Sequence, residues 1–143
     1  MKKINYFAWA LVLFFISPAW AQEGDVDFLL DFLQGQYLVI GQKPDYGECY
    51  QGKAVFKREG DHLLMLRSIN GHKVKGLGSI AAANADKVKV LRVNFPQGGR
   101  EYEVTYLIHS DLDNYARLTG YLYLKSGATK NPGLEALFID AQP

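Results

Sequence analysis

Two stretches of the sequence hold residue types that hydrolytic enzymes use. His109, Ser110 and Asp111 are the three types of a catalytic triad. Triad members meet through the fold, however, and immediate neighbours at a strand end point in divergent directions. Glu101 and Glu103 would lie about 7 Å apart on one face of a strand, a distance compatible with paired carboxylate chemistry. The alternation around them turns that face to water, so we expect no catalytic site and no enzyme activity.

Metal and phosphate binding are not predicted either. His62, His72 and His109 lack the short fixed spacings of zinc ligands. Residues 111–114 begin like a calcium loop but lack the glycine and the distal glutamate that complete one. Residues 76–78, Gly-Leu-Gly, fall inside an expected strand with no helix after it, so they do not match a phosphate loop. The sequence therefore predicts no metal ligand and no cofactor.

Cys49 is the only cysteine, so the chain cannot form an internal disulfide. A reactive thiol, an intermolecular disulfide and a half-buried side chain at a strand start are the three interpretations of this residue. The sequence does not decide among them. Stability must come from packing instead of disulfide bonds.

Aromatic residues form the most suggestive set in the chain. The alternation directs five of them inward: Tyr37, Tyr50, Phe56, Tyr102 and Tyr106. Buried tyrosine hydroxyls need hydrogen-bond partners, so an interior that holds several of them could bind a ligand of mixed polarity. The alternative is that these side chains fill the core. We take the five as candidate ligand-binding residues.

The elements that must position these residues begin with a short helix. Apolar residues between Asp25 and Gln34 recur at helical spacing. Asp25 can cap the start, and Gly35 can end the helix in a left-handed conformation. Because a free helix of this length is marginal in water, its apolar face must cover another part of the fold.

After the helix, short β-rich runs are separated by turn residues every ten to twelve positions, as in sandwiches and barrels. The runs are Gln36–Gln42, Cys49–Lys57, His62–Ile69, His72–Ala82, Lys87–Phe95, Arg100–His109, Tyr115–Lys125 and Leu134–Ile139. Asn70-Gly71 is the strongest turn signal, because a type I′ turn needs positive φ at both central positions. The last run has a helical turn over Gly133–Asp140 as its alternative.

Alternation within the runs predicts a sheet with one dry and one wet face. Short links favour an up-and-down antiparallel meander, and eight such strands can close into a barrel without free edges. We therefore predict a mainly β fold, an antiparallel up-and-down barrel of about eight strands with a short N-terminal helix. A two-sheet β-sandwich is the alternative.

The first 21 residues predict a signal peptide. Two lysines precede an apolar run at about residues 6–16, and Ala19-Trp20-Ala21 has the small-x-small pattern of a cleavage site. We expect cleavage near Ala21, one domain over residues 22–143, and a periplasmic or secreted protein. The apolar run is shorter than the roughly 20 residues that span a bilayer, so no membrane span is expected.

Charge in the expected domain is nearly balanced, with 14 basic and 15 acidic residues. This balance argues against nucleic acid or an anionic membrane as the main partner, because both need a basic field. Six lysines recur on alternate strand positions: Lys53, Lys57, Lys73, Lys75, Lys87 and Lys89. Outward lysines of this kind usually keep sheets soluble.

The predicted helix, the sequence Phe-Leu-Gln-Gly-Gln-Tyr at residues 32–37 and the alternating strands resemble the lipocalin and wider calycin superfamily. In that family a short N-terminal helix closes one end of the barrel, and Gly-x-Trp begins the first strand. Gly35 and Tyr37 occupy the matching positions, with tyrosine in place of tryptophan. The resemblance implies an interior that can receive one small apolar molecule.

We therefore expect an exported soluble binding protein that holds a small apolar or amphipathic ligand inside its barrel. The alternative is a protein-binding module, such as an inhibitor or an envelope-assembly factor, that uses its loops or a sheet face. Tyr121 and Tyr123 face outward beside Arg117 and are of the residue types that anchor interfaces. The sequence leaves the oligomeric state open.

Overall fold

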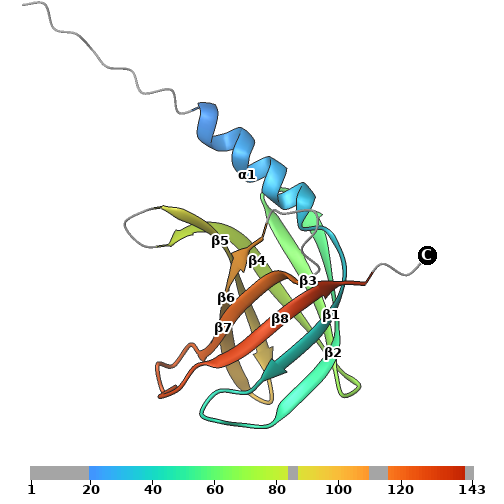
Figure 1. Cartoon of the computed structure of the whole chain (residues 1–143), viewed down its shortest axis with the longest axis vertical. Coiled ribbons are helices and arrows are strands. Elements are labelled where there is room, and N and C mark those ends of the chain that lie inside the picture. The colour runs from blue at the N-terminus through green and yellow to red at the C-terminus, as the bar shows by residue number, and fades with distance from the viewer. Residues whose placement is uncertain (1–19, 84–86, 110–115, 141–143) are drawn as a thin grey trace, which may run out of the picture.

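The computed structural model describes residues 20–83, 87–109 and 116–140, with side chains from residue 24 onward. These residues form one helix and eight strands (Figure 1). In chain order they are α1 (Trp20–Phe32), β1 (Gly35–Gln42), β2 (Cys49–Glu59), β3 (His62–Ile69), β4 (His72–Ala83), β5 (Val88–Gln97), β6 (Arg100–Ile108), β7 (Ala116–Leu124) and β8 (Gly133–Ile139). In the part of the chain so described, no helix is long and apolar enough to cross a membrane.

The strands form a closed barrel in which each pairs antiparallel with the next one along the chain. β1 also pairs with β8, where Val39 lies opposite Leu137, and this pairing closes the barrel. The predicted up-and-down barrel is therefore confirmed, and the two-sheet sandwich is excluded. The last run is a strand and not a helical turn, because its residues complete the β1–β8 and β7–β8 ladders.

The strand bounds fall within two residues of the predicted runs. β5 begins at Val88 because Lys87 has a φ of 54°, which a strand residue does not adopt. β6 ends at Ile108, one residue before the predicted end at His109. The amide of His109 still donates a hydrogen bond to the carbonyl of Arg117. Tyr115, the predicted start of the seventh strand, lies outside the described residues.

Turn chemistry agrees with the sequence at the β3–β4 hairpin. Asn70 and Gly71 have φ values of 49° and 80°, the positive pair that a type I′ turn requires. This two-residue connection fixes the register that follows, with Ile69 opposite His72 and Met65 opposite Gly76.

Helix α1 begins earlier than predicted, at Trp20 instead of Asp25. Ala21, Gln22 and Glu23 are good helix formers, so the helix continues in the N-terminal direction past the expected capping residue. The helix therefore includes the two residues before the expected cleavage point. The helix ends at Phe32, two residues before the predicted end at Gln34. The prediction that Gly35 ends the helix in a left-handed conformation is wrong, because Gly35 is the first residue of β1 and has a φ of 142°.

The helix lies at one end of the barrel (Figure 1). Apolar packing and two arginines hold it there. Leu29, Leu30 and Leu33 are buried. Arg58 of β2 pairs with the carboxylates of Asp27 and Asp31. Arg117 of β7 lies over the ring of Phe32, with its guanidinium carbon 4.1 Å from the ring centroid. Its Nη1 also donates a hydrogen bond to the Phe32 carbonyl.

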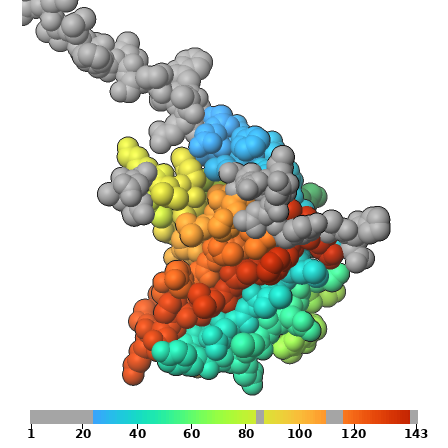
Figure 2. Space-filling view, viewed as in Figure 1, coloured from blue at the N-terminus to red at the C-terminus, as the bar shows by residue number. Residues whose placement is uncertain are grey.

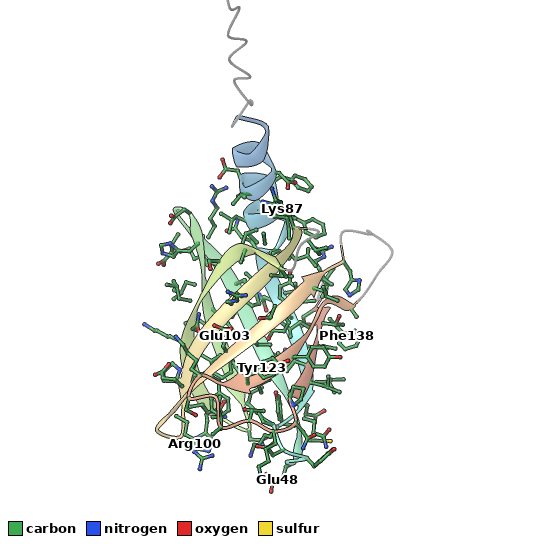
Figure 3. All side chains as sticks on the ribbon, turned by 90° about the vertical axis from the view of Figure 1, so that its left-hand side faces the viewer. Glu48, Lys87, Arg100, Glu103, Tyr123 and Phe138 are labelled. Atoms are coloured by element: carbon green, nitrogen blue, oxygen red, sulfur yellow. The ribbon has the colours of Figure 1, made fainter. Side chains whose placement is uncertain are left out.

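The barrel interior is filled by side chains from every strand. Its largest fully buried residues outside α1 include Tyr37, Val39, Phe56, Leu63, Met65, Leu91, Phe95, Tyr106, Leu118 and Leu137. These positions alternate with outward ones, as the period of a strand requires. The loops that carry Glu48 and the turn before Arg100 lie at the end of the barrel away from α1 (Figure 3).

One inward position, Gly120 of β7, has no room for a side chain. It lies opposite Tyr106 of β6 and opposite Glu135 of β8. A Cβ atom at this position would lie 2.3 Å from the carbonyl oxygen of Thr105, far inside van der Waals contact. Because the obstructing atom belongs to the backbone, the strand itself would have to shift.

We predict that Gly120→Ala lowers the free energy of unfolding by about 1–3 kcal/mol or more, the usual cost of overpacking. Gly24→Ala in α1 is the matched control, because nothing lies within 4 Å of the added Cβ and alanine is the better helix former. Urea denaturation followed by circular dichroism measures both variants. Equal stability of the two variants would contradict the prediction.

Candidate functional site

The five aromatic residues predicted as a ligand-binding set all belong to the barrel interior. Tyr37, Tyr50, Phe56 and Tyr106 are buried, and Tyr102 is half-buried. Their predicted inward orientation is therefore confirmed. Whether they bind a ligand is a separate matter, which depends on their partners and on the space between them.

Tyr37 and Phe56 form a structural contact near α1. The Tyr37 hydroxyl donates to the carbonyl of Leu33 at 3.0 Å, just after the end of the helix. The two rings meet edge to face, with centroids 5.7 Å apart. Burial raises the pKa of the Tyr37 hydroxyl, so it remains a donor. These two side chains connect β1 and β2 to the helix.

Tyr50 and Tyr106 converge on a buried carboxylate that the sequence analysis missed. The Tyr50 hydroxyl donates to Oε1 of Glu135, and the Tyr106 hydroxyl donates to Oε2. Arg67 of β3 completes the group, because its Nη1 donates to Oε1 of the same carboxylate. Both charged residues are only 3 % exposed. We call these four residues the interior cluster.

Two glycines make the interior cluster possible. Across five neighbouring strands, the residues opposite one another run from Tyr50 through Gly41, Glu135 and Gly120 to Tyr106. A Cβ at position 41 would lie 2.6 Å from the ring and hydroxyl of Tyr50. Each tyrosine therefore reaches Glu135 across a position without a side chain.

The guanidinium of Arg67 lies between two aromatic rings. Its central carbon is 5.2 Å from the Tyr50 ring centroid and 4.7 Å from that of Phe95, within the range of cation–π attraction. Among the described residues, its Nε has no hydrogen-bond partner. The ring of Tyr102 stacks on the ring of Phe95, with the two centroids 5.7 Å apart.

Electrostatics fix the protonation states of the interior cluster. Burial raises the pKa of Tyr50 and of Tyr106, and the negative charge of Glu135 raises both further. Burial is the largest single effect on Arg67 and lowers its pKa, but the attractions of Glu135, Tyr106 and Tyr50 together outweigh burial, so the pKa of Arg67 is raised. The phenols therefore remain donors and the guanidinium remains charged. Both phenols and one guanidinium nitrogen bond to the Glu135 carboxylate, so the cluster has the features of a structural network.

Space beside the interior cluster is small. A cavity of about 20 Å³ lies at the barrel end away from α1, bordered by Lys43, Tyr50, Arg67, Ile69, Gln97, Tyr102 and Leu122. A water needs roughly 10–15 Å³ of such space, whereas small-molecule sites usually have about 300–1,000 Å³. The cavity therefore has room for about one water molecule.

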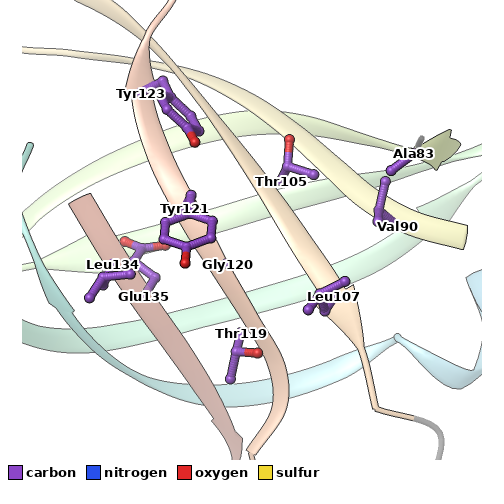
Figure 4. Close-up of a pocket in the computed structure, with 10 residues that line it drawn as sticks. All are labelled: Ala83, Val90, Thr105, Leu107, Thr119, Gly120, Tyr121, Tyr123, Leu134 and Glu135. Carbon is purple, nitrogen blue, oxygen red and sulfur yellow. The ribbon is translucent and has the colours of Figure 1, made fainter. Parts of the chain in front are cut away.

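The outer wall carries a much larger hollow. A groove of about 490 Å³ crosses β4 to β8 and is bordered by Ala83, Val90, Thr105, Leu107, Thr119, Gly120, Tyr121, Tyr123, Leu134 and Glu135 (Figure 4). Figure 2 shows the molecule hollowed between the ends of β4 and β5, in yellow, and β7 and β8, in orange to red. Tyr121 and Tyr123 lie side by side on its surface, with ring centroids 6.5 Å apart.

The exposed apolar side chains continue from this groove onto β1. Tyr121 lies opposite Leu134, and the next outward residue of β8, Ala136, lies opposite Ile40. Six large apolar side chains in this region each expose more than a third of their surface. We call them the apolar face: Leu38, Ile40, Leu107, Tyr121, Tyr123 and Leu134. The outward tyrosines were singled out from the sequence, but the leucines and the isoleucine were not.

The remaining chemical candidates stay apart from one another. Glu103 faces outward beside Tyr123 (Figure 3), and its carboxylate lies 3.5 Å from Nε of Arg92. His109 bonds to Thr119 at 2.9 Å, and Ser110 and Asp111 lie outside the described residues. Within the residues that the structure describes, no three His, Cys, Asp or Glu side chains are grouped as a metal site would need.

Cys49 is exposed at the start of β2, opposite Gln42. Its exposure rules out the half-buried interpretation. The reactive thiol and the intermolecular disulfide both remain predictions.

Comparison with known proteins adds no family assignment, since neither the models of protein families nor the curated proteins give a match. The resemblance to lipocalins is therefore supported by architecture alone, a closed eight-stranded antiparallel barrel with a short helix before its first strand.

We predict that Arg67→Met and Glu135→Leu each lower the free energy of unfolding by about 3–5 kcal/mol, because each leaves a buried charge without its partner. The double variant should cost clearly less than the two single costs together, since it leaves no unpaired charge. Urea denaturation of the unmodified protein, the two single variants and the double variant gives the coupling free energy between Arg67 and Glu135. Additive costs would show that the ion pair contributes nothing.

Alkaline pH should destabilise the protein. Tyr37, Tyr50 and Tyr106 have pKa values above those of the unfolded chain, which lie near 10. Their contribution is complete below pH 10 and is lost as pH rises, because the unfolded chain then releases protons that the folded chain retains. Above pH 10, each of these tyrosines should make the free energy of unfolding fall by about 1.4 kcal/mol per pH unit. Denaturation at pH 8 to 11 should show a smaller slope in Tyr50→Phe; equal slopes would contradict this.

Proposed function

We propose that this chain is a non-catalytic protein-binding module whose contact surface is the apolar face, and that it acts outside the cytoplasm, where the predicted leader would direct it. The observation that carries the proposal is the continuous run of exposed large apolar side chains over β6, β7, β8 and β1. Exposed apolar patches on soluble domains usually mark binding surfaces.

The composition of the apolar face suits a protein partner. Tyr121 and Tyr123 offer large rigid surfaces with a polar tip, and aromatic anchors of this type carry much of the binding energy at protein interfaces. Leu107 and Leu134 flank them on the neighbouring strands. Because the barrel is closed, its strands have no free edge for backbone pairing, so a partner would bind through side chains.

The extent of the face favours a protein over a small molecule. The groove itself, about 490 Å³, is large enough for a drug-sized compound. However, Leu38 and Ile40 extend the exposed apolar surface onto β1, beyond the residues that border the groove. A compound in the groove would leave these side chains in water. A convex apolar segment of a partner protein would cover both, and we take such a segment as the occupant.

A small ligand inside the barrel stays a prediction with less support. The five aromatic residues face inward as that prediction requires, but the cavity that Tyr50 and Tyr102 border has only about 20 Å³. An apolar ligand would have to displace core side chains. Native mass spectrometry of the purified protein tests this directly, because a retained compound would appear as added mass.

Photo-crosslinking tests the proposed surface. A benzoylphenylalanine placed at Ile40 or at Tyr121 should give the same covalent adduct in the native host, and one placed at Leu77 should not. Leu134→Ser should weaken the affinity of the identified partner about tenfold, measured by calorimetry with purified proteins. Leu77→Ser is the matched control, because both leucines are 52 % exposed and only Leu134 belongs to the apolar face.

Three results would overturn the proposal. The first is the absence of an adduct from both positions of the apolar face. The second is an adduct of equal yield from Leu77. The third is an equal loss of affinity in Leu134→Ser and Leu77→Ser, since a general effect on folding or solubility would then explain the change.

A further inference from the structure

A second groove, of different chemistry, lies on the outer wall formed by β2, β3 and β4. Its volume is about 370 Å³. Its border consists of Lys53, Val55, Leu66, Arg67, Ser68, Lys73, Val74 and Lys75. The residues of this border that face outward are lysines, aliphatic residues and one serine, and we call this site the basic groove.

The pairing of the strands places the lysines on both sides of an apolar floor. Ser68 of β3 lies between Lys53 of β2 and Lys73 of β4. In the next outward row, Leu66 lies between Val55 and Lys75. β3 therefore forms the floor, and positive charges stand on either side of it.

Most of this positive charge has no local counter-charge. Lys53 pairs with Asp140 at 3.0 Å. Among the described residues, no acidic side chain pairs with Lys73 or with Lys75, although the expected domain as a whole is nearly neutral. Outward lysines that serve only solubility need no groove between them. Here they border exposed Val55 and Leu66, which water solvates poorly.

We propose that the basic groove binds an acidic amphipathic segment of a partner protein, with apolar side chains against Val55 and Leu66 and carboxylates toward Lys53, Lys73 and Lys75. This occupant satisfies both properties of the site, since burial of the floor gives affinity and the lysines select for negative charge. A flat anionic bilayer would meet the lysines but could not fill a hollow.

The chain's own helix is a poorer occupant. α1 is acidic and exposes Phe28, so a second copy could present it to the groove. However, Asp27 and Asp31 are already paired with Arg58 of their own barrel. The contact would also be confined to one short helix, and stable interfaces bury about 1,200–2,000 Å² in total.

The basic groove is independent of the proposed function. The basic groove is centred on β3 and the groove of the apolar face on β7, four strands apart around the barrel. The two sites meet at one edge, where Leu38 of β1 lies opposite Lys53 of β2. The variants that test the two proposals avoid this edge, since Lys73 and Lys75 belong to β4 and Leu134 belongs to β8, so either proposal can fail alone.

The test uses a fluorescein-labelled 16-residue helical peptide with a leucine stripe flanked by glutamates. Fluorescence anisotropy with the full domain should show binding that weakens in 300 mM salt. Lys73→Glu/Lys75→Glu should weaken it at least tenfold. Lys125→Glu/Lys130→Glu changes the net charge equally at two exposed lysines outside the groove and should have little effect. Thermal melting followed by circular dichroism establishes that both variants fold.

Several outcomes would overturn the proposal. They are the absence of binding, equal binding of a peptide with lysines in place of glutamates, and equal weakening by the two double variants. Amide chemical-shift changes confined to β6–β8 would place the peptide on the apolar face instead. Cosedimentation with phosphatidylglycerol vesicles without peptide binding would identify a membrane surface as the occupant.

Discussion

The ion pair between Arg67 and Glu135 is the constraint on which the rest of the barrel depends. Two charges buried in an apolar interior are costly unless they are paired with each other. Tyr50 and Tyr106 donate hydrogen bonds to the Glu135 carboxylate, and glycines at the two intervening positions let them reach it. A slip of one residue in β8 would turn Glu135 outward and leave Arg67 alone. The pair therefore selects one register for closure of the barrel.

This network also limits the space inside the barrel. The interior that the lipocalin resemblance would reserve for a ligand is occupied by Arg67, the two tyrosines and the side chains packed on them. The cavity that Tyr50 and Arg67 border has a volume of about 20 Å³. The unusual surface lies outside, where Tyr121, Leu134 and Ile40 face water. These exposed side chains are the reason for proposing a contact through a sheet face in place of an internal ligand.

Sequence patterns predicted the elements well and the interior cluster poorly, for physical reasons. Alternation and turn residues are local, so the eight strands and the Asn70-Gly71 turn could be found without knowing any contact. Arg67 and Glu135 are 68 residues apart, and nothing local says that they meet. Arg67 does stand at an inward position between Met65 and Ile69, and Glu135 stands at one between Gly133 and Leu137. A charged residue at such a position, with a glycine on a neighbouring strand, is the signal that would have found the cluster.

The same ion pair joins the two outer grooves. Arg67 of β3 borders the basic groove, and Glu135 of β8 borders the groove of the apolar face. Their contact crosses the interior, so the two surfaces are held at a fixed separation by a buried charge pair. Close packing makes such an interior resist deformation. If both proposals hold, the barrel would act as a rigid spacer between two partners, one apolar and one acidic, and would not need to change shape on binding either.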